Sequence, residues 1–337
     1  MSGLDPDQAY SESLKPRPGM SLVNWAVRYD VDTARTQVSA TVADAFLSRA
    51  VYRDGLGCIV IHGEEPADSP ARGDVAGEQA FIPLLPEIAG PAVVEPTDER
   101  LRTAQDRAFT EPDHPPYRRT RAVVVLYDGH VIAERYAPGY GVATPLLGYS
   151  ATKSVISALV GILVRQGRLA VEQPAPVAAW SDPSDPRHAI TIDQLLRMTS
   201  GLALDETQSP FNPVARMLYL ERDMAGFAES AGLEAAPGSA WNYTSGNTLI
   251  ISKIIRDAVG GHAADVLRFA QRELFGPLGM RNVTLEFDAT GTPVGSTYML
   301  APARDWARFG ASHGPDGDIE GVGRLVADVI DALRTHS

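Results

Sequence analysis

The sequence lacks features that would mark several large classes of protein. It has one cysteine, Cys58, which excludes an internal disulfide framework; in the run GLGCIVIHG we predict it to be a small core residue in a strand. It has no block of basic residues and a net charge of −12, which argues against nucleic acid or an anionic membrane as main partners. The longest apolar run, around residues 155–164, is too short to span a bilayer.

The first ten residues, MSGLDPDQAY, also lack the basic and apolar regions of a secretory signal. Hydrophobic residues make up 44% of the 337 positions, which is enough for a sizeable core. Together these features predict a soluble, cytoplasmic protein.

Lysine is rare as well. The chain has only Lys15, Lys153 and Lys253, and the other 27 of its 30 basic residues are arginines. Arginine does not give up its proton in a protein, whereas lysine can. Lys153 falls just inside an apolar segment, so it is a candidate general base.

The first third of the chain shows weak structural signals. We expect a mobile arm over 1–20, strands at 36–42 and 58–63, and a long surface connection rich in Pro, Gly and acidic residues between 63 and 96. Thr97 is expected to cap a helix over 97–109.

The run RAVVVLYDGHVIAERYAPG, at 121–139, predicts a β-hairpin that turns at Asp128-Gly129. Its first strand is almost continuously apolar, so we expect that strand to be buried on both faces. The following segment, 150–167, is apolar on most faces, which is typical of a central buried helix; Gly167 ends it. Further helices are expected around 191–199, 213–231, 247–259 and 263–275, with Gly260-Gly261 ending the third of these.

The stretch GYSATKSV, 148–155, fits two different catalytic motifs. Tyr149 and Lys153 match the Y-x-x-x-K pair of short-chain dehydrogenases, but no Gly-rich dinucleotide-binding turn lies between a strand and a helix upstream. Ser150 would also match a nucleophile elbow, except that Thr152 replaces the last glycine. That reading needs a downstream histidine, and the candidates lie in loops or near helix ends: His188, His262, His313 and His336.

The alternative motif is S-x-x-K, formed by Ser150 and Lys153. Three residues apart on a helix, they share one face. At the start of the helix, free N–H groups and the positive end of the helix dipole favour an oxyanion that develops near Ser150. Lys153, one turn deeper, can accept the proton of Ser150.

A second landmark is PGSAWNYTSGNTLIISKII, 237–255, which contains Tyr243-Thr244-Ser245. With it the chain resembles serine hydrolases of the β-lactamase and penicillin-binding-protein fold, above all the class C-like branch with its esterases, D-aminopeptidases and 6-aminohexanoate-oligomer hydrolases. That branch carries S-x-x-K and then Y-x-N or Y-x-S just before a helix. Three further segments match in order, at 190–202, 273–280 and 298–310.

The resemblance implies an acyl-enzyme mechanism acting on a small-molecule amide or ester, without cofactor or metal. Ser150 would be the nucleophile, with Lys153 and Tyr243 as base and proton relay. Ser245 would hydrogen-bond Lys153 or the substrate, or only cap the helix that follows. Trp241 would line the pocket or pack against it.

The resemblance implies an α/β (α+β) fold with an antiparallel sheet, flanking helices and a mainly helical subdomain. We expect an N-terminal extension over 1–96 and a β-lactamase-like domain over 97–337. Within that domain, 97–145 and 311–337 would form the α/β layer and 146–310 the mainly helical part.

The family's third motif, K-T-G or H-x-G on a core strand, has no clear match. Ser312-His313-Gly314 is the nearest, but Pro315 follows it, so we expect strands between 310 and 321 to be absent and a last helix over 324–337. Because that strand supplies an oxyanion donor, its loss predicts weak catalysis. The alternatives are an inactive relative acting as a binding protein and, more distantly, a dehydrogenase using Tyr149 and Lys153.

Overall fold

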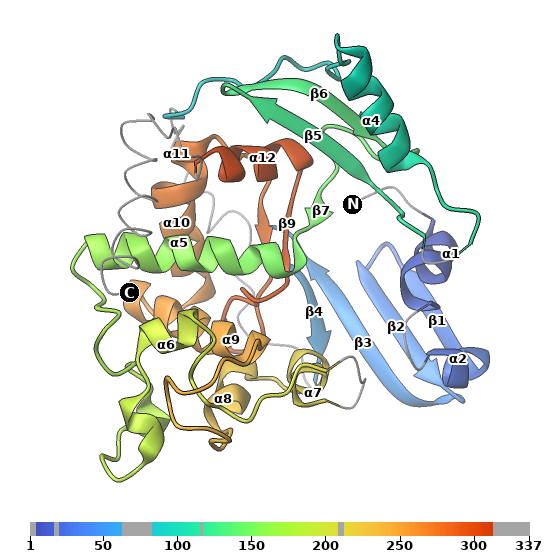
Figure 1. Ribbon diagram of the computed structural model, residues 1–337. Helices are drawn as coiled ribbons and strands as arrows, with labels where there is room; N and C mark the ends of the chain where they lie inside the picture. Colours follow the sequence, from blue (N-terminus) through green and yellow to red (C-terminus); the bar gives the residue numbers. More distant parts are fainter. Residues whose placement is uncertain (1–4, 17–19, 63–82, 115–116, 208–211, 313–337) are drawn as a thin grey trace.

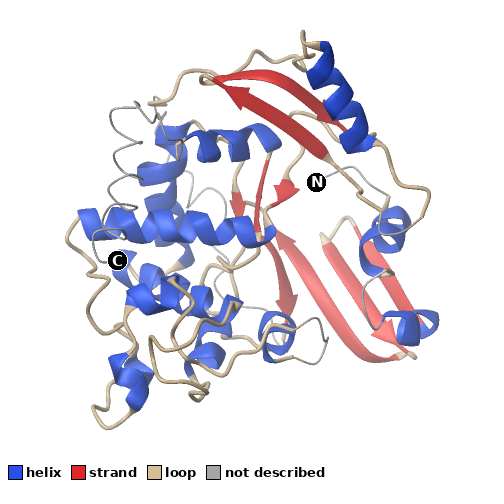
Figure 2. Ribbon diagram, viewed as in Figure 1, coloured by secondary structure: helices blue, strands red, loops and turns tan. Residues whose placement is uncertain are grey.

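The strands form three separate antiparallel sheets, and α5, residues Thr152–Arg165, crosses the middle of the molecule (Figure 1). Figure 2 shows that most of the helices gather on one side of the molecule and the N-terminal sheet lies on the other. This computed structural model describes residues 5–16, 20–62, 83–114, 117–207 and 212–312. The segment in which we expected strands to be absent, 310–321, is described only as far as residue 312. The helix expected over 324–337 lies outside the described residues.

The N-terminal part forms a four-stranded meander in the order β1-β2-β3-β4. The two strands expected there are β2 (Gln37–Val42) and β4 (Gly57–Ile61), but β1 (Val27–Asp32) and β3 (Ala45–Arg53) were not predicted. Four short helical segments precede β1: α1 (Pro6–Ala9), a π-turn (Tyr10–Leu14), α2 (Met20–Val23) and a 3₁₀ turn (Asn24–Ala26). The first two lie within the arm expected over 1–20. Cys58 lies in a strand, as expected, but its side chain is exposed and not in the core.

The meander contacts the rest of the chain through β3 and β4. A guanidinium nitrogen of Arg53 donates to the carbonyl of Phe287 at 2.9 Å, and the N–H of Cys58 donates to Glu286 Oε1 at 2.7 Å. Gly57 has φ +67°, and a Cβ at this position would lie 2.4 Å from Glu286 Cγ. Glycine is therefore required where the Glu286 side chain crosses the meander.

The predicted hairpin is confirmed as β5 (Ala122–Tyr127) and β6 (His130–Tyr136). Two helices pack on it, α4 (Glu99–Phe109) and α12 (Ala303–Ala311). The cap of α4 is Asp98 and not Thr97, because the Asp98 carboxylate accepts the N–H of Arg100. β5 is only half-buried, so the expectation of a strand buried on both faces was wrong.

A buried ion pair fixes the hairpin to α12. Glu134 on β6 is 1% exposed, and its carboxylate accepts hydrogen bonds from the guanidinium of Arg304 and from the hydroxyl of Tyr136. Arg304 also donates to the carbonyls of Gly90 and Ala92. Partners for both charges offset the cost of burying them.

The helical part packs around α5, which is apolar and buried along most of its length, as predicted. It ends at Arg165, with Gln166 as its cap and Gly167, whose φ is +68°, directly after. Besides α9 (Ser245–Val259), this part contains a series of shorter helices: α6 (Ile192–Leu196), α7 (Pro213–Leu220), α8 (Met224–Glu229), α10 (Ala263–Ala270), a π-turn (Gln271–Phe275) and α11 (Gly276–Leu278). Short 3₁₀ turns occur at Ala178–Trp180 and Pro186–Ala189.

The region expected to be mainly helical, 146–310, also contains a small sheet in the order β7-β9-β8. Its strands are β7 (Leu146–Leu147), β9 (Met299–Ala301) and β8 (Thr284–Leu285). One residue after β7, the N–H of Gly148 donates to the carbonyl of Met299 at 2.8 Å. This sheet therefore fixes the backbone immediately before Ser150.

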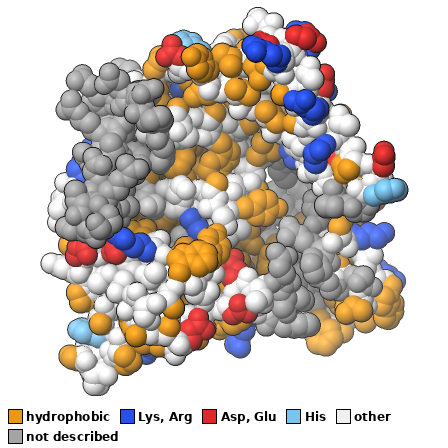
Figure 3. Space-filling model, in the orientation of Figure 1, with side chains coloured by type: hydrophobic (Ala, Val, Ile, Leu, Met, Phe, Trp, Pro, Cys, Tyr) orange, Lys and Arg blue, Asp and Glu red, His pale blue; other side chains and the backbone are white. Residues whose placement is uncertain are grey.

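The surface in Figure 3 carries charged side chains over α4 and exposed hydrophobic ones over the region of α2, where Leu22 and Trp25 are 77% and 76% exposed. Within the described part of the chain, no helix combines the length and the hydrophobicity needed to cross a bilayer.

Candidate active site

Ser150 lies in a tight turn between β7 and α5. Residues Tyr149–Ala151 form a 3₁₀ turn that leads directly into α5. Tyr149 has φ +46°, which is unusual for a residue with a Cβ. The backbone therefore reverses sharply before Ser150, whose side chain is exposed.

Lys153 is the second residue of α5 and contacts three groups from different parts of the chain. Its Nζ lies 3.3 Å from Ser150 Oγ, 3.3 Å from Ser245 Oγ and 2.9 Å from the carbonyl oxygen of Ser296. Ser245 and Ser296 are buried, whereas Lys153 itself is half-buried. The amine is thus held by buried acceptors on one side and faces Ser150 on the other.

Tyr243 reaches Ser150 from the segment before α9. Its hydroxyl donates to Ser150 Oγ at 2.7 Å, and its ring centroid lies 4.9 Å from Lys153 Nζ. Tyr243 therefore contacts both the lysine and the serine. Trp241 lies beside it, with ring centroids 6.3 Å apart, and is 69% exposed.

Ser245 is the first residue of α9, and the cap is the preceding Thr244, whose side chain accepts the N–H of Gly246. Both polar groups of Ser245 instead bond to Glu206. The backbone N–H donates to Glu206 Oε2 at 2.5 Å, and the hydroxyl donates to Glu206 Oε1 at 3.0 Å. Glu206 was not among the residues that the sequence pointed to.

The segment before Glu206 explains its position and gives the signal that could have revealed it. In the run LALDE, Leu202 and Leu204 are buried, while Ala203 and Asp205 are exposed. This alternation is the period of an extended strand, and it places Glu206 on the inner face. Because buried polar groups are hydrogen-bonded, a carboxylate at an inward position is expected to have a buried partner.

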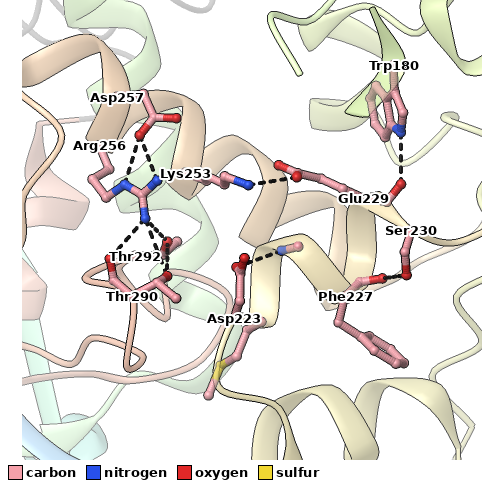
Figure 4. A network of polar contacts seen from close by, with 12 residues as sticks. Trp180, Asp223, Phe227, Glu229, Ser230, Lys253, Arg256, Asp257, Thr290 and Thr292 are labelled. Atoms are coloured by element: carbon pink, nitrogen blue, oxygen red, sulfur yellow. Dashed lines mark hydrogen bonds and ion pairs between the residues drawn. The ribbon is translucent and has the colours of Figure 1, made fainter. Parts of the chain in front are cut away.

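The third lysine has a different role. Lys253 Nζ pairs with Glu229 Oε2 at 2.7 Å, and the indole N–H of Trp180 donates to the carbonyl of Glu229 (Figure 4). Arg256 and Thr292 form a separate group of contacts nearby. Burial raises the pKa of Glu229, an effect that the hydrogen bond from Lys253 opposes. Lys253 therefore serves the packing of α8 against α9.

A nucleophile elbow would need a histidine. The two candidate histidines that the structure describes contact other groups. A ring nitrogen of His188 lies 2.8 Å from the carbonyl of Trp180, and His262 caps α10. His313 and His336 lie outside the described residues. Of the nearest match to the third motif, only Ser312 is described; it caps α12, and its hydroxyl donates to Phe309. The described residues contain no cluster of three or more His, Cys, Asp or Glu able to hold a metal.

The sequence matches a family model for β-lactamase over residues 106–335, about two thirds of the chain. The chain belongs to the β-lactamase family. The match includes all three of the further segments noted in the sequence, at 190–202, 273–280 and 298–310.

Two solved structures are similar to the chain, and the first of them shares its fold. A protein of Bacillus anthracis described as a 6-aminohexanoate-dimer hydrolase has a TM-score of 0.52 and 22% identity, covering 71% of this chain and 64% of its own. FmtA of Staphylococcus aureus has a TM-score of 0.48 and 14% identity, covering 66% and 68%. The β-lactamase-family chain thus spans slightly less than two thirds of the Bacillus protein. The resemblance expected from S-x-x-K and Tyr243-Thr244-Ser245 is confirmed at the level of family and fold.

Proposed function

We propose that the protein is a serine hydrolase that cleaves a small amide or ester through an acyl-enzyme on Ser150. The observation that carries this proposal is the convergence of Lys153 and Tyr243 on Ser150 Oγ, at 3.3 Å and 2.7 Å. These are hydrogen-bonding distances between a nucleophile, a candidate base and a candidate acid.

The acylation step follows from these contacts. Ser150 Oγ bonds to the carbonyl carbon of the substrate, and its proton passes to Lys153 Nζ. As the C–N or C–O bond breaks, Tyr243 gives its hydroxyl proton to the leaving nitrogen or oxygen, and Lys153 returns a proton to Tyr243. The net result is an ester on Ser150 and a free amine or alcohol.

Water completes the cycle. It attacks the acyl carbon and gives a proton to the Tyr243 and Lys153 pair, which returns it to Ser150 Oγ as the acid leaves. The backbone N–H of Ser150, in the 3₁₀ turn that leads into α5, is our candidate for one oxyanion donor. Trp241, exposed beside Tyr243, is the candidate wall of the substrate site.

A fluorophosphonate probe tests the proposal because it reacts covalently with activated serines. We expect wild type to be labelled once and Ser150→Ala not at all. Ser154→Ala is the matched control, since Ser154 is an exposed serine one turn further along α5. Label that persists on Ser150→Ala, or that is absent from wild type, would refute the nucleophile.

Hydrolysis of p-nitrophenyl acetate then separates an enzyme from an inactive relative. We expect turnover by wild type and a loss of about 10²–10⁴-fold in Lys153→Ala, the usual contribution of a positioned general base. Probe labelling without turnover would favour the binding-protein alternative.

A further inference from the structure

A carboxylate lies behind the candidate base, connected to it through one hydroxyl group. Glu206 Oε1 accepts the hydroxyl of Ser245 at 3.0 Å, and Ser245 Oγ in turn lies 3.3 Å from Lys153 Nζ. Ser245 is 1% exposed, so its hydroxyl has few other partners. The contacts form a chain in the order Glu206, Ser245, Lys153, Ser150.

The number of hydrogens available fixes the direction of each hydrogen bond in this series. A hydroxyl has one hydrogen to donate. A carboxylate cannot donate, so the Ser245 hydrogen points to Glu206 and an oxygen lone pair faces Lys153. In its base form Lys153 has two N–H groups, and the buried acceptors Ser245 Oγ and Ser296 O take both of them. The remaining lone pair of Nζ is then left for the proton of Ser150.

We propose that Glu206 is a positioning residue that keeps the Ser245 hydroxyl turned away from Lys153 and so leaves the lysine lone pair free. This inference rests on the proposed function. Without the carboxylate, the Ser245 hydrogen can turn to Lys153 Nζ and occupy the lone pair that Ser150 needs.

Two further contacts fix the position of the Glu206 carboxylate. Its second oxygen, Oε2, accepts the backbone N–H of Ser245 at 2.5 Å, so both carboxylate oxygens bond to one residue. Leu204, two residues earlier, packs on α9 so closely that a Cβ on Gly246 would lie 2.4 Å from it. The carboxylate therefore sits at a fixed place beside the first turn of α9.

Glu206→Gln is the informative change because it keeps size and shape. Glutamine has one acceptor oxygen and an NH₂ donor. If the oxygen accepts the N–H of Ser245, the NH₂ group donates to the hydroxyl, whose hydrogen then turns towards Lys153. We expect the labelling rate and kcat to fall about 10- to 100-fold, with KM changed little, which is less than the complete loss of a base.

Asp205→Asn is the matched control. It changes the net charge by the same amount one residue away, on an exposed side chain, and we expect rates like those of wild type. The second test places Glu206→Gln in a Ser245→Ala background. There the backbone bond to residue 206 remains but no hydroxyl can turn, so Glu206→Gln should cause no further loss.

The outcomes are distinguishable. Equal rates for wild type and Glu206→Gln would overturn the inference while leaving Ser150 as nucleophile. The same loss in both backgrounds would also overturn it, because the effect would then come from the backbone contact. A wild type without label would reject the proposed function, and this inference with it.

Discussion

The hydroxyl of Ser150 lies between two groups of different chemistry, an amine at 3.3 Å and a phenol at 2.7 Å. In the proposed reaction the amine activates the nucleophile and the phenol serves the leaving group. Leaving groups differ in how much they need a proton: an amine must be protonated to depart, whereas p-nitrophenol leaves readily as an anion. The two roles can therefore be separated by the choice of substrate.

Tyr243→Phe removes the phenol proton but keeps the ring beside Trp241 and Lys153. We predict that kcat for an anilide or alkyl amide falls by about 10²–10⁴-fold, while the rate of acylation by a p-nitrophenyl ester falls much less. Burst kinetics on the two substrates measures this. Tyr149→Phe is the matched control. If it lowered the rate as much as Tyr243→Phe does, Tyr149 would take part in catalysis.

At this scale the sequence revealed the residues whose spacing is local. Ser150 and Lys153 are one helical turn apart, and Tyr243 precedes a recognisable helix, so they could be named as candidates without a structure. The alternation in LALDE could have placed Glu206 on an inner face, but not beside Ser245, because that contact depends on how the segment crosses the start of α9. For the same reason, only the structure shows that Thr244, and not Ser245, caps α9.

At the scale of elements, the turn that carries Ser150 is fixed by the crossing of β7 and α12. A Cβ on Gly148 would lie 2.2 Å from a ring carbon of Trp306 on α12. The φ of Gly148 is −75°, so this glycine is needed for space and not for backbone freedom. The indole can give way only by moving α12 or the turn before Ser150.

We therefore predict that Gly148→Ala lowers the free energy of unfolding by about 1–3 kcal/mol, as overpacking does. It should also slow labelling of Ser150, because the turn shifts. Gly310→Ala, in the exposed last turn of α12 with no atom within 4 Å of its added Cβ, is the control and should stabilise by about 0.5–1 kcal/mol. Urea unfolding measures both, and a neutral Gly148→Ala would contradict the close contact.

Elements with strong local signals were the ones predicted correctly. The hairpin has an Asp128-Gly129 turn between two β-rich runs, and α5 is apolar on nearly every face. Strands β7, β8 and β9 are two or three residues long, too short to leave a periodic pattern. β1, VRYDVD, does alternate and could have been predicted, whereas β3, AFLSRAVYR, has no regular alternation and leaves no such signal.

At the scale of the whole molecule, the carboxylate of Glu286 is one of the groups that join the N-terminal meander to the rest of the protein. Burial raises the pKa of Glu286 to about 7, although the Cys58 N–H and the nearby Arg53 favour its charged form. Its pKa in the unfolded chain is near 4.5. The folded protein therefore binds a proton between these values that the unfolded chain has lost, and its stability falls as pH rises from about 4.5 to about 7.

Glu286→Gln should remove this dependence while keeping an acceptor for the Cys58 N–H. We predict equal stability of wild type and variant near pH 4.5, and a variant more stable by up to about 3 kcal/mol at pH 8. Thermal or urea unfolding at both pH values tests this, with Glu172→Gln, an exposed position, as control. Burial also raises the pKa of Asp288 and Asp305, so the difference between the two proteins is the quantity to follow. A difference that does not change with pH would contradict the prediction.

The scarcity of lysine makes one amine of the candidate site directly observable. Lys15 is exposed near the start of the chain, Lys253 is paired with Glu229, and Lys153 faces Ser150. Isotopic labelling of lysine alone thus gives three side-chain resonances in three distinct environments. The charge of the candidate base can be followed by nuclear magnetic resonance in the unaltered protein, before any substrate is known.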